Sequence, residues 1–274
     1  MKYAGKTVFI PGGTQGIGKA IAALLAAKGA NIAVFSRSKK NVDAALADIK
    51  AHCIHKKQHC EGFALDITDY AKVKTVFKAA IKKIGEPDIL LNLAGFAYPD
   101  YFENISIDQF RAMMEVNYFG IVNTVHVLLP ILKKKERAWI VNTSSQAGYL
   151  PVFGYSGYVP TKYAVIGFSE VLKSELLGTN VNVSVLCPPD TETPGFEKEN
   201  ETKPAETIEI SKAGKVLTAE QVAKEFEKGF RKGKFLIIPG FDGKLALLVK
   251  RFAPWILNMM FNSAIKKARK NKQK

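Results

Sequence analysis

KTVFIPGGTQGIG, residues 6–18, joins a short apolar run to a glycine-rich turn, and a helical pattern continues from it through residue 30. The apolar run predicts a buried strand over residues 6–11. A strand, a glycine turn and a helix in this order suit a dinucleotide pyrophosphate, because glycines let the backbone approach phosphates at the helix N-terminus. The alternative is a glycine-rich turn that binds no ligand. The predicted cofactor-binding residues in this stretch are Gly12, Thr14, Gln15, Gly16, Ile17 and Gly18.

Strand-like and helix-like patterns alternate along the rest of the chain up to about residue 240. Further strands are expected at residues 31–35, 61–66, 88–92, 138–143, 181–187 and 234–238. Further helices are expected at residues 41–51, 107–134, 158–177 and 219–231, and one more follows the third strand and ends at about residue 84. This alternation predicts an α/β fold with a doubly wound parallel sheet in a single domain, residues 1–240. A polar, proline-marked segment at about 189–215 is expected to form a mobile substrate lid.

The end of the second strand indicates which dinucleotide binds. An acidic residue there would bind the ribose 2′-hydroxyl and favour NAD. The residues here are SRSKK, 36–40, with no acid among them, and Arg37 suits a 2′-phosphate. We therefore predict NADPH, with a solvated basic loop as the alternative.

The stretch SSQAGYLPVFGYSGYVPTK, residues 144–162, is the predicted catalytic segment. Tyr158 and Lys162 are four residues apart, so a helix would place them on one face. A nearby ammonium favours the phenolate and is expected to lower the pKa of Tyr158, which would make it an acid/base near pH 7. Ser144 or Ser145 could hydrogen-bond the same substrate oxygen. The alternative is an ordinary helix face.

Composition and charge bound the class of protein. With 274 residues and 47% hydrophobic content, the chain can bury a large core. Three cysteines make no disulfide framework, no secretory signal precedes the first strand, and no uncharged apolar run reaches the roughly 18 residues of a membrane span. A cytoplasmic location is therefore expected. The segment AHCIHKKQHC, 51–60, matches no zinc-ligand spacing, so no metal is predicted.

The chain ends in an apolar and basic extension, residues 241–274. The net charge is +15, and residues 244–274 hold nine Lys/Arg and no Asp/Glu. Such an extension suits an interfacial helix on the cytoplasmic face of an anionic membrane, and the alternative is packing against the core or a second subunit. Its apolar residues at helical spacing are Leu245, Leu248, Val249, Phe252, Ile256, Met259 and Met260.

Five motifs follow one another along the chain: GGTQGIG, NLAG (92–95), an asparagine in the apolar run MMEVNYFG (113–120), the SS…Tyr-x-x-x-Lys segment and PPDTET (188–193). In this order they resemble the short-chain dehydrogenase/reductase family. The resemblance implies a Rossmann fold and hydride transfer from a nicotinamide to a carbonyl. It implies Tyr158 as the acid/base, Lys162 as its partner and ribose ligand, and Asn117 as the proton relay. It also implies Ser145 as the catalytic serine, with Ser144 as the fallback. The remaining cofactor-binding residues predicted are Asp66, Ile67, Asn92, Ala94, Gly95, Pro188, Thr191 and Thr193.

Within that family, PPDTETPGF with EKENETKPAET, residues 188–207, resembles the subgroup that reduces the long-chain sphingoid ketone 3-ketodihydrosphingosine with NADPH. The alternatives are a reductase for another lipid-like carbonyl, such as a 3-oxoacyl thioester or a steroid, and a non-catalytic NADPH-binding regulatory protein. We expect a homo-oligomer, no nucleic-acid partner, and peripheral membrane contact through the extension.

Overall fold

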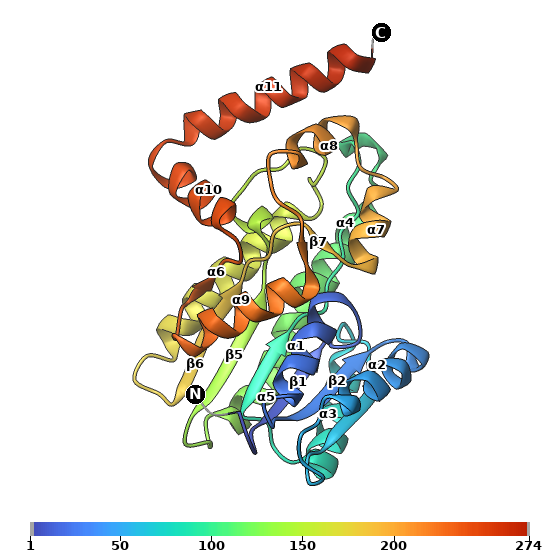
Figure 1. Cartoon of the computed structure of the whole chain (residues 1–274), viewed down its shortest axis with the longest axis vertical. Helices are drawn as coiled ribbons and strands as arrows, with labels where there is room; N and C mark the ends of the chain where they lie inside the picture. Colours follow the sequence, from blue (N-terminus) through green and yellow to red (C-terminus); the bar gives the residue numbers. More distant parts are fainter. Residues whose placement is uncertain (1–2, 273–274) are drawn as a thin grey trace.

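A computed structural model describes residues 3–272 and confirms the doubly wound α/β fold (Figure 1). All seven strands of the main sheet are parallel, in the order β3-β2-β1-β4-β5-β6-β9. From β1 the chain adds β2 and β3 on one side of the sheet, and then adds β4, β5, β6 and β9 on the other side of β1. The direction of strand addition therefore reverses between β1 and β4. Ligands of such sheets bind beside the carboxyl ends of the strands at this reversal. The strands are β1 (Thr7–Pro11), β2 (Asn31–Ser36), β3 (Cys60–Ala64), β4 (Ile89–Asn92), β5 (Ala138–Thr143), β6 (Val181–Leu186) and β9 (Leu236–Ile237).

Two helical layers cover the sheet. Apolar side chains of α1 (Gly16–Ala26), α2 (Lys39–Ala51) and α9 (Ala219–Arg231) share one core with it. Those of α3 (Tyr70–Ile84), α5 (Gly120–Leu132) and α6 (Val159–Glu175) form a second core on the opposite face. Two strands have a bound two residues away from the predicted one: the third ends at Ala64 rather than residue 66, and the last begins at Leu236 rather than residue 234.

The predicted helix over residues 107–134 is interrupted. It consists of α4 (Ile107–Met114), one π-helical turn (Glu115–Phe119) and α5. Such turns occur frequently at functional sites, and this one carries Asn117. Within residues 3–272, segment 107–132 is the one helix long and apolar enough to cross a membrane, but Ile121, Val125 and Leu128 pack into the core.

The predicted lid has secondary structure of its own. It contains β7 (Thr191–Glu192), α7 (Pro194–Asn200) and α8 (Ala205–Ser211), and β7 pairs with β8 (Leu217–Thr218) in a separate parallel ribbon. Thr193 caps α7 by accepting a hydrogen bond from the Phe196 backbone. The mobility of the lid stays a prediction.

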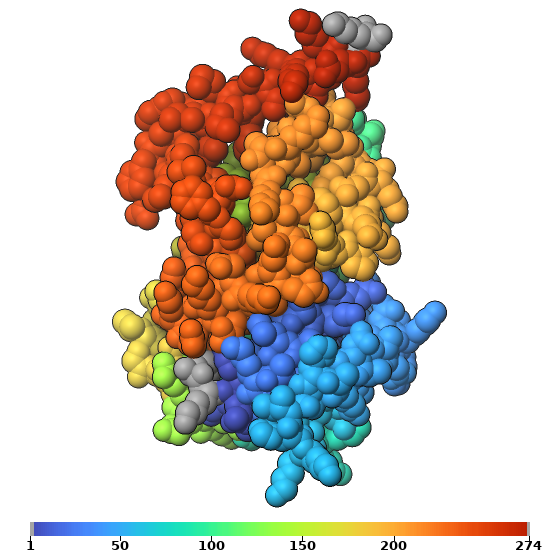
Figure 2. Space-filling view, viewed as in Figure 1, coloured from blue at the N-terminus to red at the C-terminus, as the bar shows by residue number. Residues whose placement is uncertain are grey.

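The C-terminal extension, in which an interfacial helix was expected, forms two helices. α10 (Phe241–Phe252) ends before Pro254, which lacks the backbone N–H needed to continue a helix, and α11 (Pro254–Lys272) sets off in a new direction. Figure 2 shows the extension lying across the lid, with a hollow between α10 and the lid. Lys274, the last of the predicted basic residues, lies outside the described residues.

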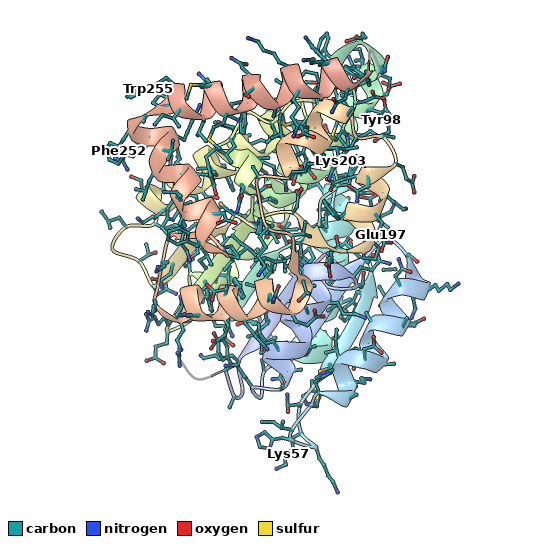
Figure 3. The ribbon with its side chains drawn as sticks, turned by 45° about the horizontal axis from the view of Figure 1, so that its top comes forward. Lys57, Tyr98, Glu197, Lys203, Phe252 and Trp255 are labelled. Atoms are coloured by element: carbon teal, nitrogen blue, oxygen red, sulfur yellow. The ribbon has the colours of Figure 1, made fainter. Side chains whose placement is uncertain are left out.

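Part of the extension packs on the domain. Leu257 is buried beside Tyr149 and Ile238, and the Tyr149 hydroxyl donates to the Gly243 carbonyl at 3.1 Å. Val249, predicted as part of one exposed face, instead packs against this cluster. Phe252 and Trp255, 71% and 65% exposed, lie at the corner between the two helices (Figure 3).

Candidate active site

A chain of buried amides and hydroxyls joins the ends of β4 and β5. Asn92 lies opposite Asn142 in the register, and its amide donates to the Asn142 side chain at 2.9 Å. Asn142 donates in turn to Ser169 of α6 at 3.0 Å, and Asn92 accepts from Thr124 of α5 at 2.7 Å. This network fixes two helices to the strand ends that form the crevice. The Asn92 side chain is thereby committed, and only its backbone faces the predicted cofactor position.

Tyr158 and Lys162 stand together at the start of α6. Tyr158 is the residue before the first turn, and the Lys162 backbone N–H donates to its carbonyl at 3.2 Å. The Lys162 ammonium lies 5.4 Å from the centre of the Tyr158 ring and donates to the Thr143 carbonyl at 3.0 Å. The β5 carbonyl therefore fixes the ammonium beneath the tyrosine.

The expectation that Lys162 lowers the pKa of Tyr158 is wrong for the chain by itself. Burial raises the pKa of Tyr158, the Glu199 carboxylate raises it further, and the Ser145 hydroxyl opposes both by hydrogen bonding. Burial also lowers the pKa of Lys162 to about 8. Desolvation disfavours the charged form of both groups and outweighs their mutual attraction. The phenol is consequently held in its protonated form, which is the form a proton donor needs.

The two serines have different surroundings. Ser144 is fully buried and donates to the Lys162 carbonyl at 2.8 Å, which ties the end of β5 to α6. Ser145 is half-buried, accepts from the Ala147 backbone at 3.1 Å, and lies within hydrogen-bonding reach of Tyr158. We retain Ser145 as the predicted catalytic serine on this placement.

Asn117 points inward from the π-helical turn. Its side chain accepts from the Phe96 backbone at 3.0 Å and donates to the Phe96 carbonyl at 2.9 Å and to Thr161 at 3.1 Å. A Cβ built on Gly95 would lie 2.9 Å from the Asn117 oxygen and 3.3 Å from the Lys162 ammonium. The absence of a side chain at Gly95 therefore lets Asn117 and Lys162 approach each other beside NLAG, where Ala94 also lies.

The glycine turn is closely packed at the carboxyl edge of the sheet. A Cβ on Gly12 would lie 2.3 Å from the Ala94 nitrogen, and one on Gly18 2.1 Å from the Gly12 oxygen. The residue before α1, Gln15, offers no side-chain cap, and the first turn, with Ile17, holds no acid. The first N–H groups of α1 therefore remain available for an anion, as a pyrophosphate requires.

The lid reaches this turn. A Cβ on Gly16, whose φ is +49°, would lie 2.7 Å from the Thr193 methyl group. Thr191 donates to the Pro189 carbonyl at 2.8 Å, and the Gln146 backbone donates to the Pro188 carbonyl at 3.0 Å. These contacts place the predicted residues Pro188, Thr191 and Thr193 along one side of the crevice, with the buried Thr14 in the turn.

The far end of the crevice carries Arg37 and Asp66. Arg37 is exposed after β2, and no carboxylate occupies residues 36–40. Asp66 accepts from the Thr68 N–H and hydroxyl at 3.0 and 2.8 Å, while Ile67 is buried next to it. An exposed guanidinium at this position leaves a charge available for a phosphate.

Sequence reasoning missed two features beside Tyr158. The ring of Tyr155 lies 5.6 Å from that of Tyr158, centre to centre, and its hydroxyl donates to the Glu199 carboxylate at 2.9 Å. A cavity of about 630 Å³ opens between residues 151–160, α8 and α11, lined mainly by Phe153, Val159, Ile210, Phe261 and Ile265. The three-residue spacing of the tyrosines was a visible signal. Nothing in the spacing distinguished Glu199 from the other lid acids.

The segment rich in histidine and cysteine, 51–60, lies away from this crevice. The sulfur atoms of Cys53 and Cys60 are 3.2 Å apart, and the His52 ring pairs with the Asp48 carbonyl at 2.9 Å. Among residues 3–272, no group of three or more His, Cys, Asp or Glu side chains is arranged to hold a metal ion.

Comparisons with known proteins agree with this geometry. The family model for short chain dehydrogenases matches residues 6–204. A 3-dehydrosphinganine reductase of Danio rerio is 39% identical over 89% of this chain and 74% of its own length. A 3-ketodihydrosphingosine reductase of Bos taurus is 39% identical over 87% of this chain and 72% of its own.

One solved structure has the same fold over nearly the whole chain. A short chain dehydrogenase/reductase of Burkholderia phymatum, in complex with NAD, superposes with a TM-score of 0.81 over 92% of this chain and 94% of its own, at 24% identity. The chain is thus an oxidoreductase that belongs to the short chain dehydrogenase family.

Proposed function

We propose that this chain reduces the keto group of 3-ketodihydrosphingosine to dihydrosphingosine, with NADPH as the reductant. The observation that carries the proposal is the position of Tyr158, beside Lys162 at the carboxyl edge of the sheet and one residue before Val159, which lines an apolar cavity together with Tyr155. The relatives named above as reductases of this ketone match most of the chain, including its lid.

The side chains around Tyr158 divide the work of the reaction. When bound, the cofactor supplies a hydride to the carbonyl carbon. Tyr158 donates its proton to the carbonyl oxygen, and Ser145 orients that oxygen by hydrogen bonding. The Lys162 ammonium, fixed by the Thr143 carbonyl, stabilises the phenolate left after proton transfer. Asn117 holds the backbone at Phe96 and supports the route by which Tyr158 is reprotonated.

The cavity suits a long hydrocarbon chain. It begins at Tyr155 and Val159, near the catalytic tyrosine, and extends to Phe261 and Ile265 of α11. Its volume of about 630 Å³ lies within the usual range for pockets that enclose a ligand, and its wall is largely apolar. A ketone held at Tyr158 would place its aliphatic tail here.

The cofactor is a nicotinamide dinucleotide, and we propose the phosphorylated form. The support is Arg37, exposed at the end of β2 and without an acidic neighbour among residues 36–40. A guanidinium binds a phosphate by charge-assisted, bidentate hydrogen bonds.

A panel of ketones tests the substrate assignment. The purified protein is mixed with NADPH and 3-ketodihydrosphingosine, a 3-oxoacyl thioester or a steroid ketone, and absorbance of the reduced cofactor is followed. The highest kcat/KM is expected for the sphingoid ketone. A higher value for another ketone would assign the protein to that substrate, and no turnover of any would favour a regulatory role.

We further propose that the extension docks on the cytoplasmic face of an anionic membrane. The large apolar side chains exposed on α10 and α11 are here named the apolar patch, and the same two helices carry basic residues. Exposed apolar patches of this kind mark contact sites, and nearby cations favour anionic lipid. The patch consists of Phe241, Leu245, Leu248, Phe252, Trp255, Ile256, Met259 and Met260.

Co-sedimentation with phosphatidylserine-containing vesicles tests the membrane proposal. The double substitution Phe252→Ser with Trp255→Ser is expected to reduce the bound fraction at least tenfold. Leu177→Ser is the control, because Leu177 is 86% exposed but distant in the sequence from the patch. Light scattering of the unbound protein distinguishes the competing explanation, in which the patch joins two copies: the double variant would then become monomeric.

A further inference from the structure

Glu199 is a half-buried carboxylate that faces the active site from the lid. One of its oxygens accepts a hydrogen bond from Tyr155 at 2.9 Å, and Tyr155 stacks at a tilt against Tyr158. The negative charge of Glu199 raises the pKa of both Tyr158 and Lys162. Burial raises the pKa of Glu199, since the low-dielectric surroundings disfavour its charged form.

No cation of residues 3–272 forms a direct ion pair with this carboxylate, although the charges of Lys203 and Lys162 act on it from a distance. Lys203 of the lid has its ammonium 3.9 Å from Asp190 and 3.9 Å from the centre of the Phe196 ring. No Lys, Arg or His of the described chain lies within 4.0 Å of a Glu199 oxygen. A buried carboxylate without a cation is costly, and such groups normally find a counter-charge. Glu199 therefore offers a site for a cation brought by the ligand.

The proposed substrate carries such a cation in a suitable position. Beside its keto carbon stands a carbon with a primary amino group, which is protonated at neutral pH. When the ketone oxygen is held by Tyr158 and Ser145, this ammonium must lie within a few ångströms of it. Tyr155, three residues before Tyr158, joins the two groups: its ring lies 5.6 Å from that of Tyr158 and its hydroxyl bonds to Glu199.

Resting on the proposed function, we propose that Glu199 binds the ammonium group of the sphingoid ketone and so selects amino ketones over neutral ketones. Tyr155 is a positioning residue, because its hydroxyl orients the carboxylate and does not contact the reacting atoms. Asp190 is less suited to this role since its charge is already paired with Lys203.

The test compares two substrates and two variants. The substrates are 3-ketodihydrosphingosine and its N-acetylated form, which keeps the ketone and the tail but has no positive charge. The variants are Glu199→Gln, which keeps the acceptor for Tyr155, and Glu197→Gln, which removes a charge from the exposed side of the same helix (Figure 3). For each protein, the ratio of kcat/KM for the amine to kcat/KM for the amide is measured.

We expect Glu199→Gln to lower this ratio at least tenfold, mainly through a higher KM for the amine, and Glu197→Gln to leave it unchanged. A charge-assisted hydrogen bond is of that size. An unchanged ratio in Glu199→Gln, or an equal loss with both substrates, would overturn the assignment. Wild-type protein that reduces neither substrate would instead refute the proposed function, so the two failures are distinguishable.

Discussion

The crevice and the lid are held together by different kinds of contact. Around the glycine turn, backbone atoms approach so closely that a Cβ on Gly18 would lie 2.1 Å from the Gly12 oxygen, and fully buried amides join the strand ends. The lid and extension are joined instead by ion pairs between exposed cations of α11 and largely covered carboxylates of α8. Arg269 of α11 pairs with Glu206 of α8 at 3.2 Å, and Lys267 pairs with Glu209 at 2.6 Å.

This difference indicates a division of function. Close backbone packing tolerates almost no change, which suits the predicted cofactor site. The cations of these ion pairs are exposed and screened by water, so substitution of the cations is expected to cost little and the lid can vary with the substrate. We therefore expect substitutions in the crevice to remove activity and substitutions in the lid to alter selectivity.

The largest effect is expected from Tyr158→Phe. The substitution removes the proton donor and keeps the ring, so turnover should fall at least a thousandfold while NADPH still binds. Stopped-flow absorbance measures turnover, and fluorescence of the reduced cofactor measures binding. Appreciable reductase activity in this variant would mean that another residue supplies the proton.

A side-by-side comparison of the two serines sharpens the contrast within the crevice. Ser145→Ala should lower kcat about a hundredfold, because it removes a hydrogen bond made to the substrate oxygen. Ser144→Ala should instead lower the free energy of unfolding by about 0.5–1.5 kcal/mol, because it removes the hydrogen bond that ties the end of β5 to the Lys162 carbonyl of α6. Kinetics and urea denaturation of both variants check this. The reverse pattern would make Ser144 the catalytic serine.

Arg37→Ala tests the phosphate end of the crevice. A bidentate contact with a 2′-phosphate contributes on the order of 1.5–3 kcal/mol, so KM for NADPH should rise about tenfold or more and KM for NADH should change little. Steady-state kinetics with each cofactor provide the measurement. Equal losses with both, or a wild-type preference for NADH, would contradict the choice of NADPH.

The smallest effect is expected at the join between lid and extension. Burial by itself raises the pKa of Glu206, but hydrogen bonds from Tyr101 and Arg269 keep this pKa below its usual value. A carboxyl whose folded pKa is lowered stabilises the fold above its unfolded pKa of about 4.3 and loses that contribution as pH falls through the folded value.

Glu206→Gln should therefore lower Tm by a few degrees at pH 7, with little effect on KM for NADPH. The difference from the wild type should shrink as the pH falls below about 4. Thermal denaturation across this pH range checks the expectation. A difference that stays constant with pH would show that the charge of Glu206 is not what holds the lid to α11.

The sequence predicted the elements whose signal is local. Short patterns of apolar residues, glycines or fixed intervals predict the glycine turn, the seven strands and the shared helix face of Tyr158 and Lys162. The observed sheet order agrees with the doubly wound fold predicted from their alternation.

Other features depend on contacts between distant segments. The raised pKa of Tyr158 follows from burial and from Glu199, which is 41 positions away in the chain. The cavity is formed by residues 151–160 together with α8 and α11, and the orientation of α11 is decided by the break at Pro254. No periodicity within either segment indicates that they meet.

Turnover of the sphingoid ketone is the most direct test of the central claim. Wild-type protein and Tyr158→Phe are mixed with NADPH and 3-ketodihydrosphingosine in detergent micelles, and dihydrosphingosine is quantified by mass spectrometry. The account predicts one molecule of product for each NADPH oxidised by the wild type and none above background from the variant. Absence of product from a wild-type protein that binds NADPH and reduces another ketone would contradict it.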